Sequence, residues 1–104
     1  MHKSGLLLAV TFAVTALTTG SYAADPNAGR ELARRWCAVC HVVESNQERA
    51  PTVAPPFATI AKSSGFDAAQ LAKSMLAPHP QMPGRELSRD QAADIAAYIA
   101  TLAN

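Results

Sequence analysis

The chain has few cysteines and histidines, the residues that most often build metal and redox sites. It contains two cysteines in 104 residues, and a closed zinc site needs four ligands. Because there is no second cysteine pair, zinc is an alternative only if His41 and His79 supply the two missing ligands. No run resembles a buried strand, and we find no internal repeat and no low-complexity segment.

A long apolar run is also missing. The longest stretch, Leu6 to Leu17, has twelve residues, whereas a bilayer span needs ~20. It follows a short basic start and is followed by small residues, which is the three-part pattern of a secretory signal peptide. Small side chains at Ser21 and Ala23 predict cleavage before Ala24, with an uncleaved anchor as the alternative. We therefore expect the mature protein to work outside the cytoplasm.

Positive and negative charges are almost balanced in this chain. Cleavage after the signal peptide, residues 1–23, removes 23 of 104 residues and leaves 81, which is one small domain at 24–104. Nine Lys and Arg stand against eight Asp and Glu, and the loss of Lys3 leaves eight of each sign. The mature chain is then formally neutral, so we expect neither nucleic acid nor an anionic membrane surface as a partner. We also expect no membrane span in the mature form.

Both cysteines lie in one motif, Cys37-Ala38-Val39-Cys40-His41. Two thiols and an imidazole at this spacing are typical of a c-type haem attachment site. Positions three and four apart share one face of a helical turn, so each thiol can add to a vinyl group of the porphyrin while His41 coordinates the iron. A disulfide redox centre is an alternative, although it normally needs a βαβ context. A second alternative is that both cysteines are buried thiols without a chemical function.

The remaining sequence predicts helices and loops. We expect a helix that begins at Pro26 with Asp25 as its N-cap and runs into the haem motif, then an extended loop over 42–56. A short helix is predicted from Phe57 to Lys62, closed by 63–65. Pairs that resemble capping boxes, Asp67 with Gln70 and Ser88 with Gln91, begin two further helices. The apolar positions of the three longer helices are Gly29, Leu32, Ala33 and Trp36; Leu71, Met75 and Leu76; and Ala92, Ile95, Ile99 and Leu102, with Tyr98 beside the last set.

Between the last two helices lies a loop with three prolines, from Pro78 to Gly84. Pro83 keeps Met82 out of a helix, and in a chain with a haem a thioether held in a rigid loop is a suitable distal iron ligand. Met75 is a competitor, but its place on an amphipathic helix is better explained by packing. His79 is a second competitor, for which surface exposure is the default interpretation.

In these motifs the chain resembles the class I cytochromes c, as a small bacterial periplasmic member, over Asp25 to Leu102. The resemblance implies an all-α fold of three to four helices wrapped around one covalent haem c per chain. It also implies a contact between Gly29 and Tyr98 where the first and last helices cross. In the family a proline carbonyl commonly accepts the second N–H of the proximal histidine, and Pro55 lies in the right loop for this role.

The chain also departs from the family pattern. Ala33 stands where an aromatic residue is often found, and Trp36 is the alternative for that place. The only tryptophan precedes the haem motif, so a haem propionate would have to be bound by other side chains. Arg49, Ser63 and Ser64 are candidates, although a solvated Arg49 is the favoured interpretation of that residue. The lysine-rich docking face of mitochondrial relatives is missing, since only Lys62 and Lys73 remain in the mature chain.

With His41 and Met82 both on the iron, no position is open for substrate, and the chemistry that remains is one-electron cycling between Fe(II) and Fe(III). We therefore expect a periplasmic electron carrier and not an enzyme. Its partners would be redox proteins, a dehydrogenase as donor and an oxidase or reductase as acceptor, with the chain a monomer or a complex subunit. A haem-carrying acceptor subunit of a periplasmic dehydrogenase is one alternative. An open-iron protein with peroxidase or gas-binding activity is the other.

Overall fold

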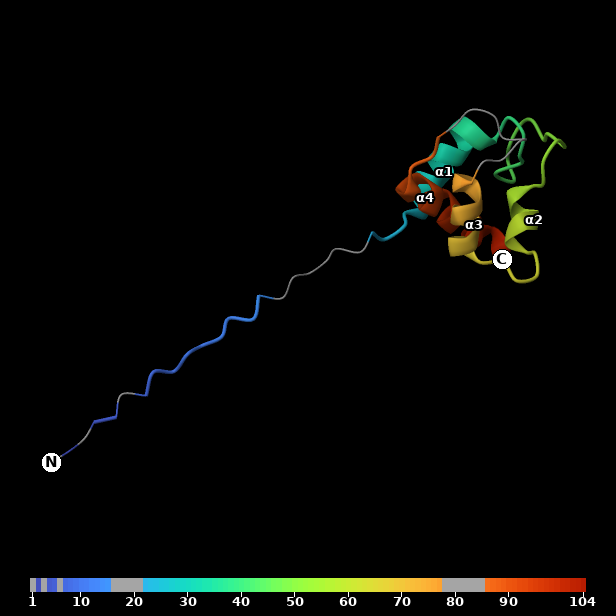
Figure 1. The fold of residues 1–104 in the computed structure, drawn as a ribbon. Coiled ribbons are helices and arrows are strands. Elements are labelled where there is room, and N and C mark those ends of the chain that lie inside the picture. Colours follow the sequence, from blue (N-terminus) through green and yellow to red (C-terminus); the bar gives the residue numbers. More distant parts are fainter. Residues whose placement is uncertain (1, 3, 6, 16–21, 78–85) are drawn as a thin grey trace.

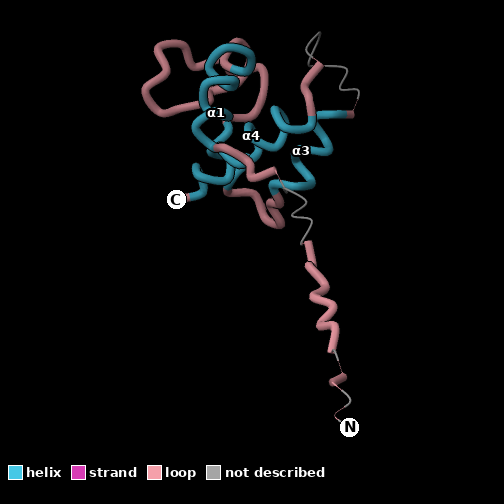
Figure 2. The backbone as a smooth tube through the Cα atoms, turned by 90° about the vertical axis from the view of Figure 1, so that its left-hand side faces the viewer, coloured by secondary structure: helices cyan, strands magenta, loops and turns pink. Residues whose placement is uncertain are grey.

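The structure, a computed structural model, describes residues 2, 4, 5, 7–15, 22–77 and 86–104. Within this part of the chain every regular element is a helix and no strand occurs (Figures 1 and 2). The predicted all-α class is therefore confirmed. The elements in chain order are α1 (Pro26–Leu32), a π-helical turn (Ala33–Cys37), α2 (Phe57–Ala61), α3 (Ala68–Leu76), α4 (Arg89–Ala100) and a closing 3-10 turn (Thr101–Ala103).

Helix α1 begins as the sequence predicts and leads directly into the haem motif. The Asp25 carboxylate accepts hydrogen bonds from the backbone N–H of Asn27 at 2.9 Å and of Ala28 at 3.3 Å, with Pro26 at the first helical position. After Leu32 the backbone widens into the π-helical turn, which ends at Cys37. The sequence does not signal this widening. The predicted buried face of the helix is nonetheless present.

Helices α1 and α4 cross at closest range beside Gly29, a residue that is buried (Figures 1 and 2). A Cβ on Gly29 would overlap the carbonyl group of Asp94 and approach the backbone nitrogen of Ile95. The predicted crossing is confirmed. The closest approach to Gly29 is made by the backbone of α4 at Asp94 and Ile95, about one turn before Tyr98. The expected contact of Gly29 with the Tyr98 ring stays a prediction.

Local capping explains where the other helices begin and end. Pro56 precedes α2, and Gly65 takes a positive φ of 74° in the turn that follows this helix. The Asp67 carboxylate accepts from the N–H of Gln70 at 3.0 Å and caps α3, which ends before Pro78 as predicted. Ser88 and Gln91 form both bonds of a capping box at the start of α4.

Helix α4 is the centre of the core and packs against both α1 and α3 (Figure 1). Ile95 and Ile99 on α4 are fully buried, and the loop residue Val43 joins them. Leu71 and Met75 of α3 are half-buried against this cluster, while Leu76, which was expected in the core, is 41% exposed. The buried hydrophobic residues are Leu32, Ala33, Val43, Phe57, Ala61, Ala92, Ile95, Ala96, Tyr98 and Ile99.

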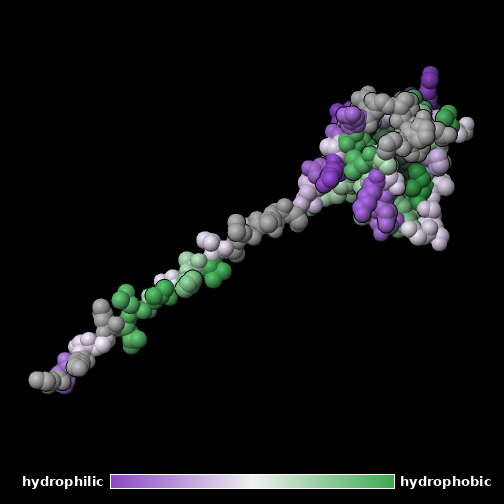
Figure 3. All heavy atoms as spheres, in the orientation of Figure 1, coloured by the Kyte–Doolittle hydropathy of each residue, from purple (hydrophilic) through white to green (hydrophobic). Residues whose placement is uncertain are grey.

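The N-terminal segment lies apart from the helical body. Its described apolar residues are exposed, with Leu7 at 96% and Phe12 at 89%, and Figure 3 shows them as a hydrophobic row on an extended chain. None of the helices in the described residues is both long and apolar enough to cross a membrane. The predicted cleavage before Ala24 is not tested by these observations.

Candidate functional site

The motif Cys37 to His41 forms a single helical turn at the end of the π-helix. The N–H of Cys40 donates to the carbonyl of Cys37 at 3.1 Å, and the N–H of His41 donates to the same carbonyl at 2.9 Å. These two bonds place positions three and four apart on one side of the turn, as the spacing predicted. Both cysteines are free thiols and half-buried. The two thiols and the imidazole therefore belong to one compact local structure.

The environment of Cys37 does not suit a redox-active disulfide. Burial raises the pKa of the Cys37 thiol to about 11, because the thiolate would be poorly solvated. Disulfide oxidoreductases need the opposite, a thiol whose pKa is lowered by nearby positive charge or a helix N-terminus. A cluster of three or more His, Cys, Asp and Glu side chains able to hold a metal ion is also absent from the described residues, although His79 lies outside them.

The imidazole of His41 is held from behind by the loop that follows the motif. Its Nδ1 lies 2.6 Å from the carbonyl oxygen of Pro55, which confirms the role expected for that proline. A carbonyl can only accept, so Nδ1 carries the proton and Nε2 keeps the lone pair that can bind a metal. The ring of Phe57 packs against the imidazole with centroids 5.0 Å apart. These contacts fix both the tautomer and the direction of the ring.

Gln47, which the sequence analysis did not single out, holds this loop to the motif. Its Oε1 accepts from the N–H of Val43 at 2.8 Å, and its Nε2 donates to the carbonyls of His41 at 3.1 Å and Ala38 at 3.2 Å. One amide therefore bridges three backbone groups around the turn. No feature of the local sequence distinguishes Gln47 from a solvated glutamine, so only the folded loop shows its role.

Three backbone contacts fasten the same loop at other points. The Tyr98 hydroxyl donates to the carbonyl of Val43 at 2.6 Å in a buried hydrogen bond. The N–H of Phe57 donates to Val42 at 2.9 Å, and the N–H of Ala54 donates to Cys40 at 3.2 Å. Tyr98 thus does more than pack in the helix crossing, since it ties α4 to the segment beside the proximal histidine.

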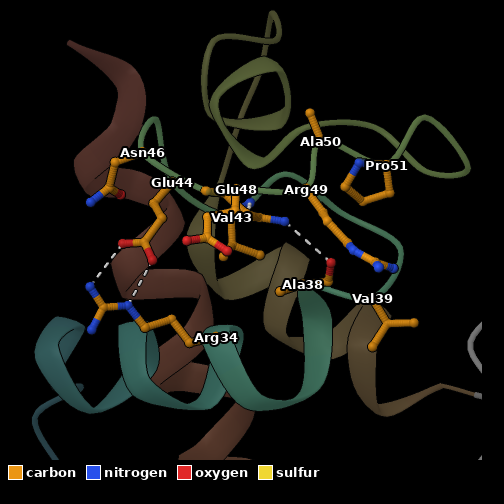
Figure 4. A pocket seen from close by; sticks show the side chains of 11 residues that line it. Arg34, Ala38, Val39, Val43, Glu44, Asn46, Glu48, Arg49, Ala50 and Pro51 are labelled. Carbon is orange, nitrogen blue, oxygen red and sulfur yellow. Dashed lines mark hydrogen bonds and ion pairs between the residues drawn. The ribbon is translucent and has the colours of Figure 1, made fainter.

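An ion-pair cluster joins α1 to the beginning of the loop. Glu44 accepts from Arg34 at 2.8 Å (Figure 4). It also accepts from Arg30 at 3.1 Å, and Arg34 also reaches Glu31 at 3.1 Å. Hydrogen bonds from Arg34, and then from Arg30, hold the pKa of the Glu44 carboxyl below its usual value. Arg30 and Arg34 are thus engaged with acidic side chains of this chain.

A cleft of about 880 Å³ opens beside this cluster (Figure 4). Its walls include Ala38 and Val39, the two residues between the cysteines, but neither cysteine nor His41. Arg49, proposed above for a propionate, lines this cleft. Ser63, another of those candidates, donates its hydroxyl to the carbonyl of Ile60 at 2.6 Å. The cleft is therefore not where the thiols and imidazole would hold a haem.

A set of half-buried apolar side chains suits a large apolar cofactor. These side chains come from the π-helical turn, α2 and α3 and pack against the same core cluster as Cys37, among them Ile60, Leu71 and Met75. Met75 belongs to this packed set, which agrees with its interpretation as a core residue. The two loop candidates, Met82 and His79, lie outside the described residues.

An all-α domain in which two free thiols and an oriented imidazole share one helical turn is the architecture of a covalent haem protein. The family model for cytochrome c matches residues 26–103, and the chain belongs to this family. The cofactor is therefore haem c with its iron, and the protein is a haem electron carrier and not an enzyme, with other redox proteins as its partners.

The chain is also similar to cytochrome c-552 of Bradyrhizobium diazoefficiens. The two are 44% identical over 102 residues, which cover 98% of this chain and 96% of the relative. No solved structure gives a significant match to the chain.

Proposed function

We propose that this protein is a periplasmic one-electron carrier with a single haem, attached to Cys37 and Cys40 and ligated by His41 and Met82. The observation that supports it best is the hydrogen bond of 2.6 Å between His41 Nδ1 and the Pro55 carbonyl. It directs Nε2 away from the loop and raises the basicity of the ring as a ligand. When bound, the haem iron supplies the Fe(II)/Fe(III) couple.

Each residue of the motif has a separate task. Cys37 and Cys40 each hold one edge of the porphyrin through a thioether, so the loss of one thiol leaves a single attachment point. His41 supplies the proximal nitrogen, and Pro55, Phe57 and Gln47 keep it in place.

Met82 is proposed as the distal ligand from the sequence alone. Its thioether is a soft ligand in a segment constrained by neighbouring prolines. The packing of Met75 against the core leaves Met82 as the better candidate. Two strong axial ligands leave no site for a substrate, which supports transfer of single electrons over peroxidase or gas-binding chemistry.

The proposal includes export and processing. The signal peptide would be residues 1–23, the haem domain 24–104, and the site of action the periplasm. The short apolar segment with small residues before Ala24 supports this. The alignment with the relative, which covers 98% of this chain, also includes most of that segment.

The distal ligand is tested by the visible spectrum of the ferric protein, matured in a host with cytochrome c assembly machinery. We expect a weak sulfur-to-iron charge-transfer band that is lost in Met82→Ala and kept in Met75→Ala. The second variant is the matched control, because it removes a thioether of the same kind from α3. A high-spin or bis-histidine spectrum of the unaltered protein would show that Met82 is not on the iron.

A further inference from the structure

Asp94 is a buried carboxylate that the haem site does not use. It lies on α4 with 6% of its surface exposed. Its Oδ1 accepts two hydrogen bonds from the chain just before α1, one from the Tyr22 hydroxyl at 2.6 Å and one from the N–H of Asp25 at 2.8 Å. A carboxylate so far from water is costly unless donors or a positive charge compensate it.

The surroundings of the Tyr22 hydroxyl are strongly negative. The hydrogen bond to Asp94, then desolvation, and then the charges of Asp94, Asp90 and Asp25 raise the pKa of Tyr22 to about 12, because a phenolate there would be poorly solvated and would face carboxylates. The same field that disfavours an anion favours a cation. Yet among the described residues the hydrogen-bond donors to Asp94 Oδ1 are the backbone N–H of Asp25 and the neutral hydroxyl of Tyr22.

Cleavage before Ala24 would change this arrangement. Hydrolysis of the Ala23–Ala24 bond adds the elements of water, leaving a carboxylate on Ala23 and an amine on Ala24 that takes up a proton near neutral pH. Tyr22 departs with the signal peptide, so Asp94 loses one of its two donors. The new amino nitrogen stays one residue from the Asp25 nitrogen, within about 4 Å along the chain.

We infer that Asp94 is the binding site for the N-terminal ammonium group of the processed chain, which replaces the Tyr22 hydroxyl and forms an ion pair with the carboxylate. This inference rests on the processing step of the proposed function. The ligand chemistry is that of a primary ammonium held by a carboxylate, with the Asp25 N–H as the second donor.

The position of Asp94 gives the ion pair a consequence for the haem site. The carbonyl oxygen of Asp94 is the nearest atom to a Cβ placed on Gly29, so Asp94 lies against α1 through its backbone, and its side chain would bind the new N-terminus. Helix α1 continues into the turn that carries Cys37. Processing would therefore lock the crossing of α1 and α4 that supports the haem motif.

The test uses exported holoprotein whose first residue has been determined by intact mass. Chemical transamination of the N-terminus converts the amine to a carbonyl group and removes its charge. We expect it to lower the folding equilibrium constant, measured by guanidinium denaturation, by about tenfold or more. In Asp94→Asn the same treatment should change this constant less than about twofold.

Glu86→Gln is the matched control, since it removes an exposed carboxylate just before α4 that does not contribute to the negative field at the Tyr22 hydroxyl, and it should keep the full effect of transamination. A second variant, with two glycines inserted before Ala24, moves the ammonium away while Asp94 stays intact, and should lose the effect. If transamination lowers the folding equilibrium constant by the same factor in all of these variants, the inference is overturned.

A purified chain that still contains Tyr22 also overturns it, because no ammonium then forms at residue 24. If the same sample has the spectrum of a c-type haem, the haem assignment holds and only the processing step has failed.

Discussion

At the scale of single residues, the histidine that would bind the iron depends on side chains that never touch it. Gln47 offers a donor group and an acceptor, and both are used on backbone groups around the turn. A hydrophobic residue in its place would leave the N–H of Val43 and the carbonyls of Ala38 and His41 without this partner. Partly buried backbone groups without partners cost more than the average hydrogen bond contributes.

We predict that Gln47→Leu lowers the free energy of unfolding of the ferric protein by about 1–3 kcal/mol. The measurement is guanidinium denaturation followed at the haem absorbance. Asn46→Ala is the control, because Asn46 is an exposed neighbour in the same loop, and we expect it to stay within about 0.5 kcal/mol of the unaltered protein. Equal effects of the two substitutions would show that Gln47 does not hold the loop.

At the scale of elements, the crossing of α1 and α4 determines where the haem motif lies relative to the core. The crossing is close because Gly29 has no side chain where the Asp94 carbonyl approaches. Glycine makes the intrinsic free energy of helix formation less favourable by about 1 kcal/mol relative to alanine. The Asp25 cap and Pro26 at the first helical position offset part of that cost.

We predict that Gly29→Ala destabilises the protein by about 3 kcal/mol or more, although alanine is the better helix former. The reason is that the added methyl group must displace the backbone of α4. Thermal unfolding of the ferric protein would measure the loss, with Asn27→Ala as a control on the exposed side of the same helix. A stability equal to or above that of the unaltered protein would mean that the helices can separate without cost.

At the scale of the whole molecule, the polypeptide builds a small core. Four of the ten buried hydrophobic residues in the described part of the chain are alanines, which contribute little apolar surface. Domains of this size often need a covalent cross-link or a bound metal in addition to their hydrophobic core. A covalent haem would supply apolar surface that the half-buried side chains of α2 and α3 can cover.

We predict that a Cys37→Ala, Cys40→Ala double variant, which cannot attach haem, loses most of its helical signal in far-UV circular dichroism and shows no cooperative thermal transition. Met82→Ala is the comparison, because it keeps both thioethers and should stay folded with a lower midpoint. A cooperative transition of the double variant at the temperature of the holoprotein would show that the polypeptide core is sufficient.

The sequence by itself determined the helical class, the caps at Asp25, Asp67 and Ser88, and the motif from Cys37 to His41. These features depend on residues close in sequence, whose hydrogen bonds and periodicity are local. The match to the cytochrome c family over residues 26–103 agrees with that prediction. The distal ligand Met82 is still a prediction from the same local reasoning.

Only the tertiary structure decided which distant groups meet. It brought Gln47 onto the haem motif, set Gly29 against the backbone of Asp94, and buried the Asp94 carboxylate beside the backbone of Asp25 at the start of α1. These contacts join residues up to 69 positions apart, and helix periodicity does not determine the angle or register at which two helices cross. Close packing of the side chains around α4 determines both.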